Sequence, residues 1–276
     1  MKKEHPKNGL HTEHFENGQK CLEGYYKNGK RDGNWTRWHE NGQKEAKGNY
    51  KDDEFDGKLT HWYENGQMKS EEHSIIGIRE GKQTQWHESG QIEASGNYKD
   101  DKEDGLLTLW YENGQIKSEQ NYKDGIKDGK FTEWFDNGQK ESEANYKDDK
   151  LDGKVTWWYE NGQKKEEGNY KDDKLYGKWT RWHENGQIKS EEYYKNDKFD
   201  GKCTKWHENG QKEQEGNYND DKQDGKWTTW HENGKKYSEG KFKNGKTDGK
   251  WTWWHENGQK RAERNYKNGE CISGDC

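Results

Sequence analysis

Histidines that precede glutamates are the residues of this sequence whose types could do chemistry. Such pairs recur at multiples of 24 residues, with the histidine at His39, His87, His183, His207, His231 and His255. A zinc-protease motif would need a second histidine one helical turn later, and in a strand a His and the following Glu point to opposite faces. Histidines a whole repeat apart cannot share one metal. We therefore expect structural histidines packed on neighbouring tryptophans, and no metal site.

Carboxylates are the second candidate chemistry. The sequence has 55 Asp and Glu residues, but hydrolysis by paired acids needs one special pair in a cleft, and these acids recur alike along the chain. Calcium turns are disfavoured because Lys flanks the Asp-Asp pairs and offsets their charge. The chain lacks a G-x-S-x-G, a phosphate loop and a dinucleotide fingerprint. We expect no catalytic residue, no cofactor and no enzyme activity.

A strict internal repeat explains why no acid is singled out. Glycines recur every 24 residues, at Gly9, Gly33, Gly57, Gly81, Gly105, Gly129, Gly153, Gly177, Gly201, Gly225 and Gly249. With each of these glycines as position 1, the consensus is G-K-W-T-x-W-H-E-N-G-Q-K-x-x-E-G-N-Y-K-D-D-K-x-D. The organisation expected is an N-terminal tail (1–8), one domain of eleven repeats (9–272) and a C-terminal tail (273–276).

Each repeat has the pattern of a β-hairpin. Positions 2–7 and 11–18 carry strand-forming Trp, Thr and Tyr. The Asn-Gly between them is a strong hairpin signal, and a second tight turn follows at positions 19–22. A single hairpin is marginally stable, so neighbouring repeats must bury each other's aromatic rings. The sequence predicts an all-β fold, an elongated array of antiparallel hairpins.

The face that is buried depends on the register of the hairpin. A two-residue loop would pair position 6 with 13, and a three-residue loop with a glycine bulge would pair it with 12. We favour the second register, which gathers Trp at 6, Gly at 16 and Tyr at 18 on one face. The predicted core is Trp38, Trp62, Trp86, Trp110, Trp134, Trp158, Trp182, Trp206, Trp230 and Trp254, with Tyr50, Tyr98, Tyr122, Tyr146, Tyr170, Tyr194, Tyr218 and Tyr266. Position 3, on the other face, would offer Trp35, Trp179, Trp227 and Trp251 to a partner.

Charge and composition exclude several classes of function. The net charge is −6, with mixed signs along the chain, which gives no basic footprint for duplex nucleic acid. No long apolar run predicts a transmembrane helix, and the N-terminus lacks the apolar segment of a secretory signal. The four cysteines, Cys21, Cys203, Cys271 and Cys276, are few and mostly far apart. This fits a reducing, cytoplasmic location. Cys271 and Cys276 could pair or bind a metal, and inert thiols are the favoured expectation.

Repeat 3, residues 57–80, departs most from the consensus. Its Tyr is replaced by Ser74, and its polar turn becomes Ile75-Ile76-Gly77-Ile78. Three isoleucines at an otherwise charged turn could form a knob that binds a partner. The alternative, which we weigh more heavily, is local repacking that replaces the absent Tyr ring.

The segment from Tyr26 to Gly33, with Trp35, Trp38 and the Glu40-Asn-Gly-Gln43 turn, resembles the variant MORN repeat. Bacterial arrays of this variant are similar to the YwqK-like antitoxins, which are immunity partners of secreted toxins. The resemblance implies hairpin arrays without enzymatic activity that bind proteins. We therefore expect a protein-binding scaffold, with a toxin as the partner that it occludes. The alternative is a scaffold of membrane surfaces or cell architecture that binds lipid headgroups or proteins.

Overall fold

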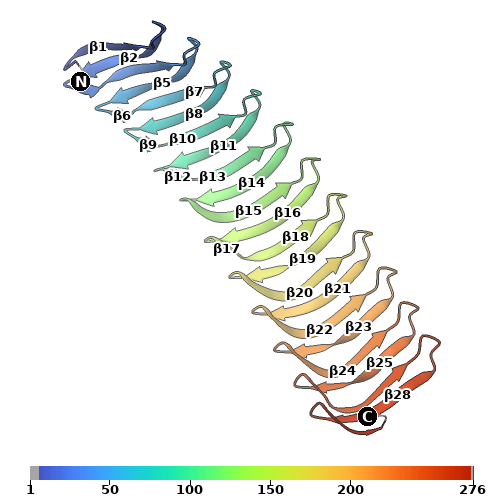
Figure 1. Ribbon diagram of the computed structural model, residues 1–276. Coiled ribbons are helices and arrows are strands. Elements are labelled where there is room, and N and C mark those ends of the chain that lie inside the picture. Colours follow the sequence, from blue (N-terminus) through green and yellow to red (C-terminus); the bar gives the residue numbers. More distant parts are fainter. Residues whose placement is uncertain (1–5, 275) are drawn as a thin grey trace. The chain divides into compact units, whose positions relative to one another are not determined.

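The structure, a computed structural model, describes residues 6–274 and 276. Residues 1–5 of the expected N-terminal tail, and residue 275, lie outside the described residues. Every regular element of the described part is a β-strand, so the predicted all-β hairpin array is confirmed. The described part holds no helix long and apolar enough to cross a membrane. The chain divides into an N-terminal body that ends at Gly138 and a C-terminal body that begins at Gln139 (Figure 1).

The strands of the N-terminal body follow one another in antiparallel hairpins. They are β1 (Gly9–His14), β2 (Lys20–Lys27), β3 (Lys30–Arg31), β4 (Gly33–Trp38), β5 (Lys44–Lys51), β6 (Glu54–Phe55), β7 (Gly57–Trp62), β8 (Met68–Ile75), β9 (Ile78–Arg79), β10 (Gly81–Trp86), β11 (Ile92–Lys99), β12 (Lys102–Glu103), β13 (Gly105–Trp110), β14 (Ile116–Lys123) and β15 (Ile126–Trp134).

The C-terminal body repeats the same arrangement. Its strands are β16 (Lys140–Lys147), β17 (Lys150–Leu151), β18 (Gly153–Trp158), β19 (Lys164–Lys171), β20 (Lys174–Trp182), β21 (Ile188–Lys195), β22 (Lys198–Trp206), β23 (Lys212–Asn219), β24 (Lys222–Trp230), β25 (Lys236–Lys243), β26 (Lys246–Thr247), β27 (Gly249–Trp254), β28 (Lys260–Lys267) and β29 (Glu270–Gly274). The last strand therefore includes two residues of the expected C-terminal tail.

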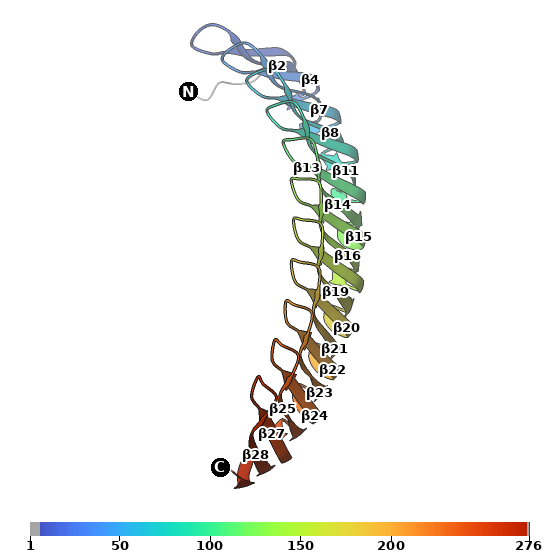
Figure 2. The ribbon, with the colours of Figure 1, turned by 90° about the vertical axis from the view of Figure 1, so that its right-hand side faces the viewer.

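The first turn of each repeat has the three-residue loop that the sequence favoured. In repeat 2 the backbone N–H of His39 donates to the carbonyl of Gln43 at 2.8 Å. Gly42 is left-handed, with φ 84°, and Trp38 pairs with Lys44. Position 6 therefore lies opposite position 12, as predicted. In Figure 2 these loops face the viewer.

A β-bulge beside this pair reverses the predicted faces. Arg37, next to Trp38, pairs with Ala46, so that Glu45 at position 13 is left as an extra residue. Because strand side chains alternate between faces, one extra residue changes the face of every later residue relative to its partner. Trp35 at position 3 consequently lies opposite Gly48, and the Trp at position 6 lies on the other face. The predicted grouping of position 6 with positions 16 and 18 is wrong.

The core is built from position 3 of one repeat resting on position 16 of the repeat before it. A Cβ placed on Gly24, Gly168, Gly216 or Gly240 would lie 1.8 to 2.2 Å from the nearest ring atom of Trp35, Trp179, Trp227 and Trp251, respectively. Only glycine leaves room for an indole at that distance. Burying one such ring stabilises the fold by up to about 4–6 kcal/mol from its area alone.

The remaining described steps obey the same complementarity. Leu59 and Leu107 rest on Gly48 and Gly96. Where position 16 carries a side chain, the next position 3 is never Trp; these pairs are Glu72 with Gln83, Gln120 with Phe131, Ala144 with Val155 and Glu192 with Cys203. The two positions, 11 residues apart, therefore share one volume.

Tyrosine at position 18 joins this core from the same face. The Tyr218 and Trp227 ring centroids lie 5.1 Å apart, and Trp227 meets Phe242 at 6.1 Å, both edge to face. Tyr194 is buried, whereas the other tyrosines predicted for the core are half-buried. Each ring therefore contacts the rings of its own and the adjacent repeat, which couples neighbouring hairpins.

The second turn is a two-residue loop in which both residues are left-handed. Asn28 and Gly29 have φ of 55° and 80°, and Asp172 and Asp173 have 49° and 64°. Aspartate tolerates this conformation less well than glycine, but its side chain adds a bond to the preceding repeat. The backbone N–H of Leu151 donates to Oδ1 of Asp173 at 2.7 Å.

Position 7 joins adjacent repeats at the other end of the strands. The ring Nε2 of His207 lies 3.1 Å from the carbonyl oxygen of Trp230, which requires the tautomer with hydrogen on Nε2. In another repeat, the hydroxyl of Tyr159 donates at 2.9 Å to the backbone carbonyl of Trp182, which is the equivalent residue of the repeat that follows it. His and Tyr can replace each other at this position because both can donate across the same gap, whereas Phe15 and Phe135 stand there in repeats 1 and 6.

Candidate functional site

The four tryptophans at position 3 are not a partner-binding surface. Trp35, Trp179, Trp227 and Trp251 are only 3–7% exposed. The indole N–H groups of Trp35, Trp227 and Trp251 donate to backbone carbonyls of the preceding repeat at 3.0–3.2 Å. The prediction failed because the bulge at position 13 turns these rings into the core.

The position 6 tryptophans form the opposite, half-exposed face. None of the ten is buried, so their predicted role as the core is wrong. The ammonium of Lys212 lies 5.7 Å from the ring centroid of Trp230. Glu215 accepts from Lys212 and pairs with Lys202, and the bond from Lys212 holds the pKa of this carboxyl below its usual value. On this face, paired lysine and glutamate side chains therefore lie over the indole rings.

The isoleucines of repeat 3 are the exposed apolar feature of the N-terminal body that the sequence singled out. Ile75 ends β8, Ile78 begins β9, and the two pair across the turn. Ile75, Ile76 and Ile78 are 51%, 53% and 45% exposed. Ile75 follows Ser74 on β8, so its side chain points to the opposite face from the position of the absent Tyr ring. This placement favours the knob over the repacking alternative. We call these three residues the isoleucine tip.

Ile76 is also strained. Its φ is 48°, where the other repeats place Asn or Asp. A β-branched side chain is a genuine outlier in the left-handed region, at a cost of about 1–2 kcal/mol. Such strain persists where the surroundings enforce it, and it concentrates at sites of function.

The histidines and carboxylates do not gather into a metal-binding group in the described part of the chain. Residues 6–274 and 276 contain no group of three His, Cys, Asp or Glu placed to hold a metal ion. Five of the position 7 histidines bond to a backbone carbonyl of the next repeat, as His183 does to Trp206 at 3.2 Å; the others are His39, His87, His207 and His231. This contact gives them a structural role.

A buried polar cluster in the C-terminal body escaped the sequence analysis. Glu192, at position 16 of repeat 8, is only 3% exposed. Its carboxylate pairs with Arg181 and accepts from the hydroxyl of Tyr194 at 3.0 Å. Arg181 also reaches Glu166 at 3.3 Å. The signal in the sequence was Glu in place of Gly at position 16, followed by Cys203 in place of Trp.

Burial dominates the ionisation of this cluster. Desolvation raises the pKa of Tyr194 to about 12, and the Glu192 charge adds to the shift. Desolvation likewise raises the pKa of the Cys203 thiol to about 11. Both groups are therefore protonated near neutral pH, and the Cys203 thiol is a poor nucleophile. The arrangement stabilises a buried charge and lacks an activated group.

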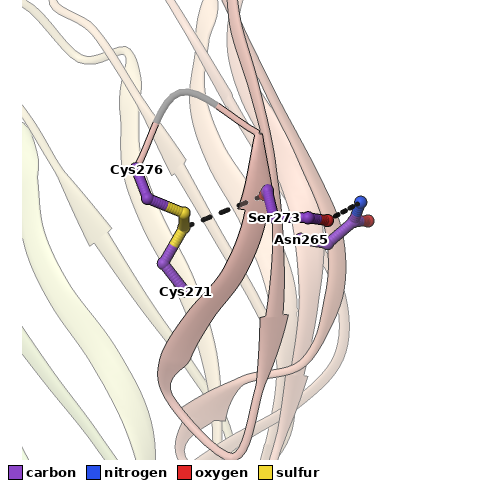
Figure 3. Close-up of a disulfide and its surroundings, with 4 residues drawn as sticks. All are labelled: Asn265, Cys271, Ser273 and Cys276. Atoms are coloured by element: carbon purple, nitrogen blue, oxygen red, sulfur yellow. Dashed lines mark hydrogen bonds between the residues drawn. A yellow bond between two sulfur atoms is a disulfide. The ribbon is translucent and has the colours of Figure 1, made fainter.

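The two C-terminal cysteines are paired. Cys271 on β29 and Cys276 form a disulfide (Figure 3), so the expectation of inert thiols is wrong. Strands β28 and β29 pair beside this disulfide. The side-chain amide of Asn265 on β28 donates to the hydroxyl of Ser273 on β29 at 3.0 Å. Cys21 is a free, half-buried thiol, and Cys203 is free and buried.

Hairpins that are stabilised by the next copy, with broad outer faces, define a repeat scaffold. The chain belongs to the MORN repeat variant family. The family profile matches eleven segments: residues 7–28, 31–52, 55–74, 79–100, 103–124, 127–148, 151–172, 175–196, 199–220, 223–244 and 247–268.

Comparisons beyond the family are distant. No curated protein matches the chain. Among solved structures, it is similar to a chain of "Crystal Structure of TcdB2-TccC3 without hypervariable C-terminal region" at 10% identity and TM-score 0.21, covering 93% of this chain and 16% of that one. A chain of "Crystal Structure of TcdB2-TccC3" gives 10% identity and TM-score 0.20, covering 96% and 18%. The chain thus spans less than a fifth of either neighbour.

Proposed function

We propose that this protein is a non-enzymatic scaffold that binds another protein, and that the partner contacts the isoleucine tip. The observation that carries the proposal is Ile76, an exposed β-branched residue held at φ 48° where other repeats have Asn or Asp. The backbone strain at this turn lowers the stability of the fold, and the exposed apolar side chains lower its solubility. Their coincidence is explained by a contact that buries the three side chains.

The surroundings of the tip support this proposal. Ile75 and Ile78 stand where repeat 2 has Lys51 and Glu54, so an apolar patch replaces charged side chains at the end of one hairpin. A partner with an apolar depression would bury three isoleucines that are about half exposed.

The test is capture of the partner from cells that make this protein. The captured complex is then measured with Ile76→Asp and Ile78→Asp introduced together. We expect at least a tenfold loss of affinity with little change in folding, because both side chains point to solvent. Ile126→Asp is the matched control, since Ile126 is 40% exposed at position 22 of another repeat. An unchanged affinity of the double variant would reject the isoleucine tip.

We further propose that the partner is a toxin, and that the scaffold acts as its cytoplasmic immunity protein by occluding the active site. The support for this step is the resemblance to YwqK-like antitoxins. The captured partner should then be toxic when made alone and should lose its activity on mixing with this protein. A partner that is harmless to cells would contradict the immunity role and leave the scaffold role intact.

A further inference from the structure

A hollow of about 410 Å³ opens on the core face of the N-terminal body, and residues of β5 and β7 line part of it. Its volume is in the range of small-molecule sites. Its walls include Trp35, Tyr50, Phe55 and Leu59, together with Arg31, Arg37 and His61. We call this site the repeat 2–3 pocket.

The pocket exists because a leucine stands where a tryptophan would fit. Gly48 at position 16 lacks a Cβ, as Gly24 does, but the atoms nearest to where a Cβ would stand belong to Leu59 at 2.9 Å and Phe55 at 3.2 Å. Ala46, on the same face of β5, is also small and lines the hollow. Leu59 is smaller than the Trp that stands at this position in four other repeats, and the hollow opens beside it.

The charge of the lining is unlike that of the whole chain. The described residues that line the pocket include Arg31, Arg37, Lys47 and His61 and no carboxylate, in a protein of net charge −6. Burial lowers the pKa of His61, so the arginines supply the positive charge near neutral pH.

Each arginine already has one acidic neighbour at the rim and still has donors for another. Arg37 contacts Glu45 through one nitrogen at 3.3 Å. Arg31 donates from Nε to Oδ1 of Asp53 at 3.3 Å and from a terminal nitrogen to the Asp53 carbonyl at 3.1 Å. A guanidinium carries five N–H donors, so the single contact of Arg37 leaves the most room for an anion. The Arg37 side chain is 59% exposed and can turn towards the pocket.

The walls suit a flat, apolar body. Trp35 and Tyr50 meet edge to face with centroids 6.1 Å apart, and Tyr50 lies 4.2 Å from Phe55. The guanidinium of Arg31 lies over the Tyr50 ring at 3.9 Å. Aromatic surfaces next to cations favour a planar aromatic ligand.

We propose that the repeat 2–3 pocket binds a small aromatic anion, with its ring against Tyr50 and Phe55 and its anionic group on Arg37. The geometry that supports this is the hollow beside Leu59, which aromatic rings line and arginines border without a lining carboxylate. The proposal uses residues separate from the isoleucine tip, so each can fail without the other.

The test uses 1-naphthoate as the probe and neutral 1-naphthamide as its isosteric comparison, titrated into the full chain by calorimetry. We expect naphthoate to bind at least fivefold more tightly than naphthamide. Arg37→Gln should remove most of this preference, because it deletes the charge but retains much of the side chain. Equal affinity for the two probes would overturn the proposal.

Leu59→Trp tests the location. This variant recreates the Trp-on-Gly step found elsewhere in the chain, so it should fold, and the indole should fill the pocket and weaken naphthoate binding at least tenfold. Leu107→Trp is the matched control, since Leu107 also rests on a glycine, Gly96, at a distant step. It should leave binding within twofold. Thermal melting verifies that both variants are folded, and retention of binding by folded Leu59→Trp would overturn the proposal.

Discussion

At the scale of single residues, aspartate in the second turn compensates for an unfavourable backbone. A left-handed non-glycine residue costs about 1 kcal/mol, and a hydrogen bond returns about the same amount. Asp173 accepts from the backbone N–H of Leu151, a residue of the preceding repeat. Asn-Gly turns also reach the preceding repeat through a backbone bond, as Gly245 does to Gln223, and the Asp-Asp turns add this side-chain bond to it.

We expect Asp173→Ala to lower the free energy of unfolding by about 1–2 kcal/mol, because alanine keeps the strain and loses the bond. Asp173→Gly should stay within about 0.5 kcal/mol of the wild type, because glycine removes both the backbone strain and the hydrogen bond. Urea unfolding of the two variants measures the difference. Equal destabilisation by Ala and Gly would contradict this compensation.

Position 7 makes a second prediction at this scale. His207→Tyr should preserve stability, since tyrosine makes the equivalent bond in other repeats, as Tyr159 does. His207→Phe should cost about 0.5–1.5 kcal/mol, because the carbonyl of Trp230 then loses its donor. Chemical denaturation compares the pair, and a Phe variant as stable as the Tyr variant would show that the hydrogen bond is dispensable.

The raised pKa of Tyr194 predicts a dependence of stability on alkaline pH. The folded state holds this proton more tightly than the unfolded state, whose phenol has the ordinary pKa of 10.0. The stabilisation is therefore fully present below pH 10 and is lost as pH rises towards about 12. Tyr194→Phe should flatten the fall in melting temperature between about pH 10 and 12. Tyr176→Phe, at a 50% exposed tyrosine, should follow the wild type.

At the scale of the strand pair, the sequence predicted the hairpins, both turns and the pairing of position 6 with 12. It did not predict the bulge at position 13, because residues as different as Glu45, Lys69 and Tyr237 stand there and none signals an extra residue. Because of this one extra residue, the tryptophans at position 6 that were predicted for the core lie on the outer face. A signal was nevertheless present: Trp at position 3 follows only a glycine at position 16.

Neither the exposure of the isoleucine tip nor the repeat 2–3 pocket could be predicted from the sequence. The departure of Ile75, Ile76 and Ile78 from the consensus was visible, but whether these side chains turn inward depends on the face of each strand. The pocket depends on how Leu59 and Phe55 pack over Gly48, which only a packed structure reveals.

The shared volume of positions 16 and 3 can be tested by exchange. Gly216→Ala should destabilise the protein by about 2–4 kcal/mol, because the new Cβ meets the Trp227 ring at 2.2 Å. Adding Trp227→Val should recover part of this loss, since Ala with Val is the native pair at Ala144 and Val155. A double-mutant cycle in urea measures the coupling, and strictly additive effects would refute it.

At the scale of the whole molecule, stability is spread over neighbouring repeats and is not held in one centre. The aromatic contacts of the C-terminal body join each repeat to the next, as Trp227 does between Tyr218 and Phe242. In such arrays the energy is approximately a sum of repeat and interface contributions. The two bodies, which meet in the chain at Gly138 and Gln139, each contain several complete repeats.

We therefore expect the fragment 139–276 to fold by itself. Circular dichroism should show β-structure with a cooperative melt at a lower temperature than the full chain, because the fragment has fewer repeats to share the stability. The single repeat 201–224 is the comparison and should be unfolded, since it lacks both neighbours. A fragment 139–276 without a cooperative transition would contradict additive stability.

The resting of position 3 on position 16 of the preceding hairpin has a consequence for how such a gene can grow. The matched residues lie on either side of the boundary at position 1, so a copied segment is compatible only if it brings Gly216 together with Trp227, or Glu192 together with Cys203. A crossover that separated the residues of these pairs could join Glu192 to a repeat with Trp at position 3. An indole would then lie against a glutamate. Duplications that break between positions 4 and 15, in the first turn or the strand ends beside it, avoid this clash. The inherited module is therefore offset from the 24-residue motif that begins at the repeated glycine.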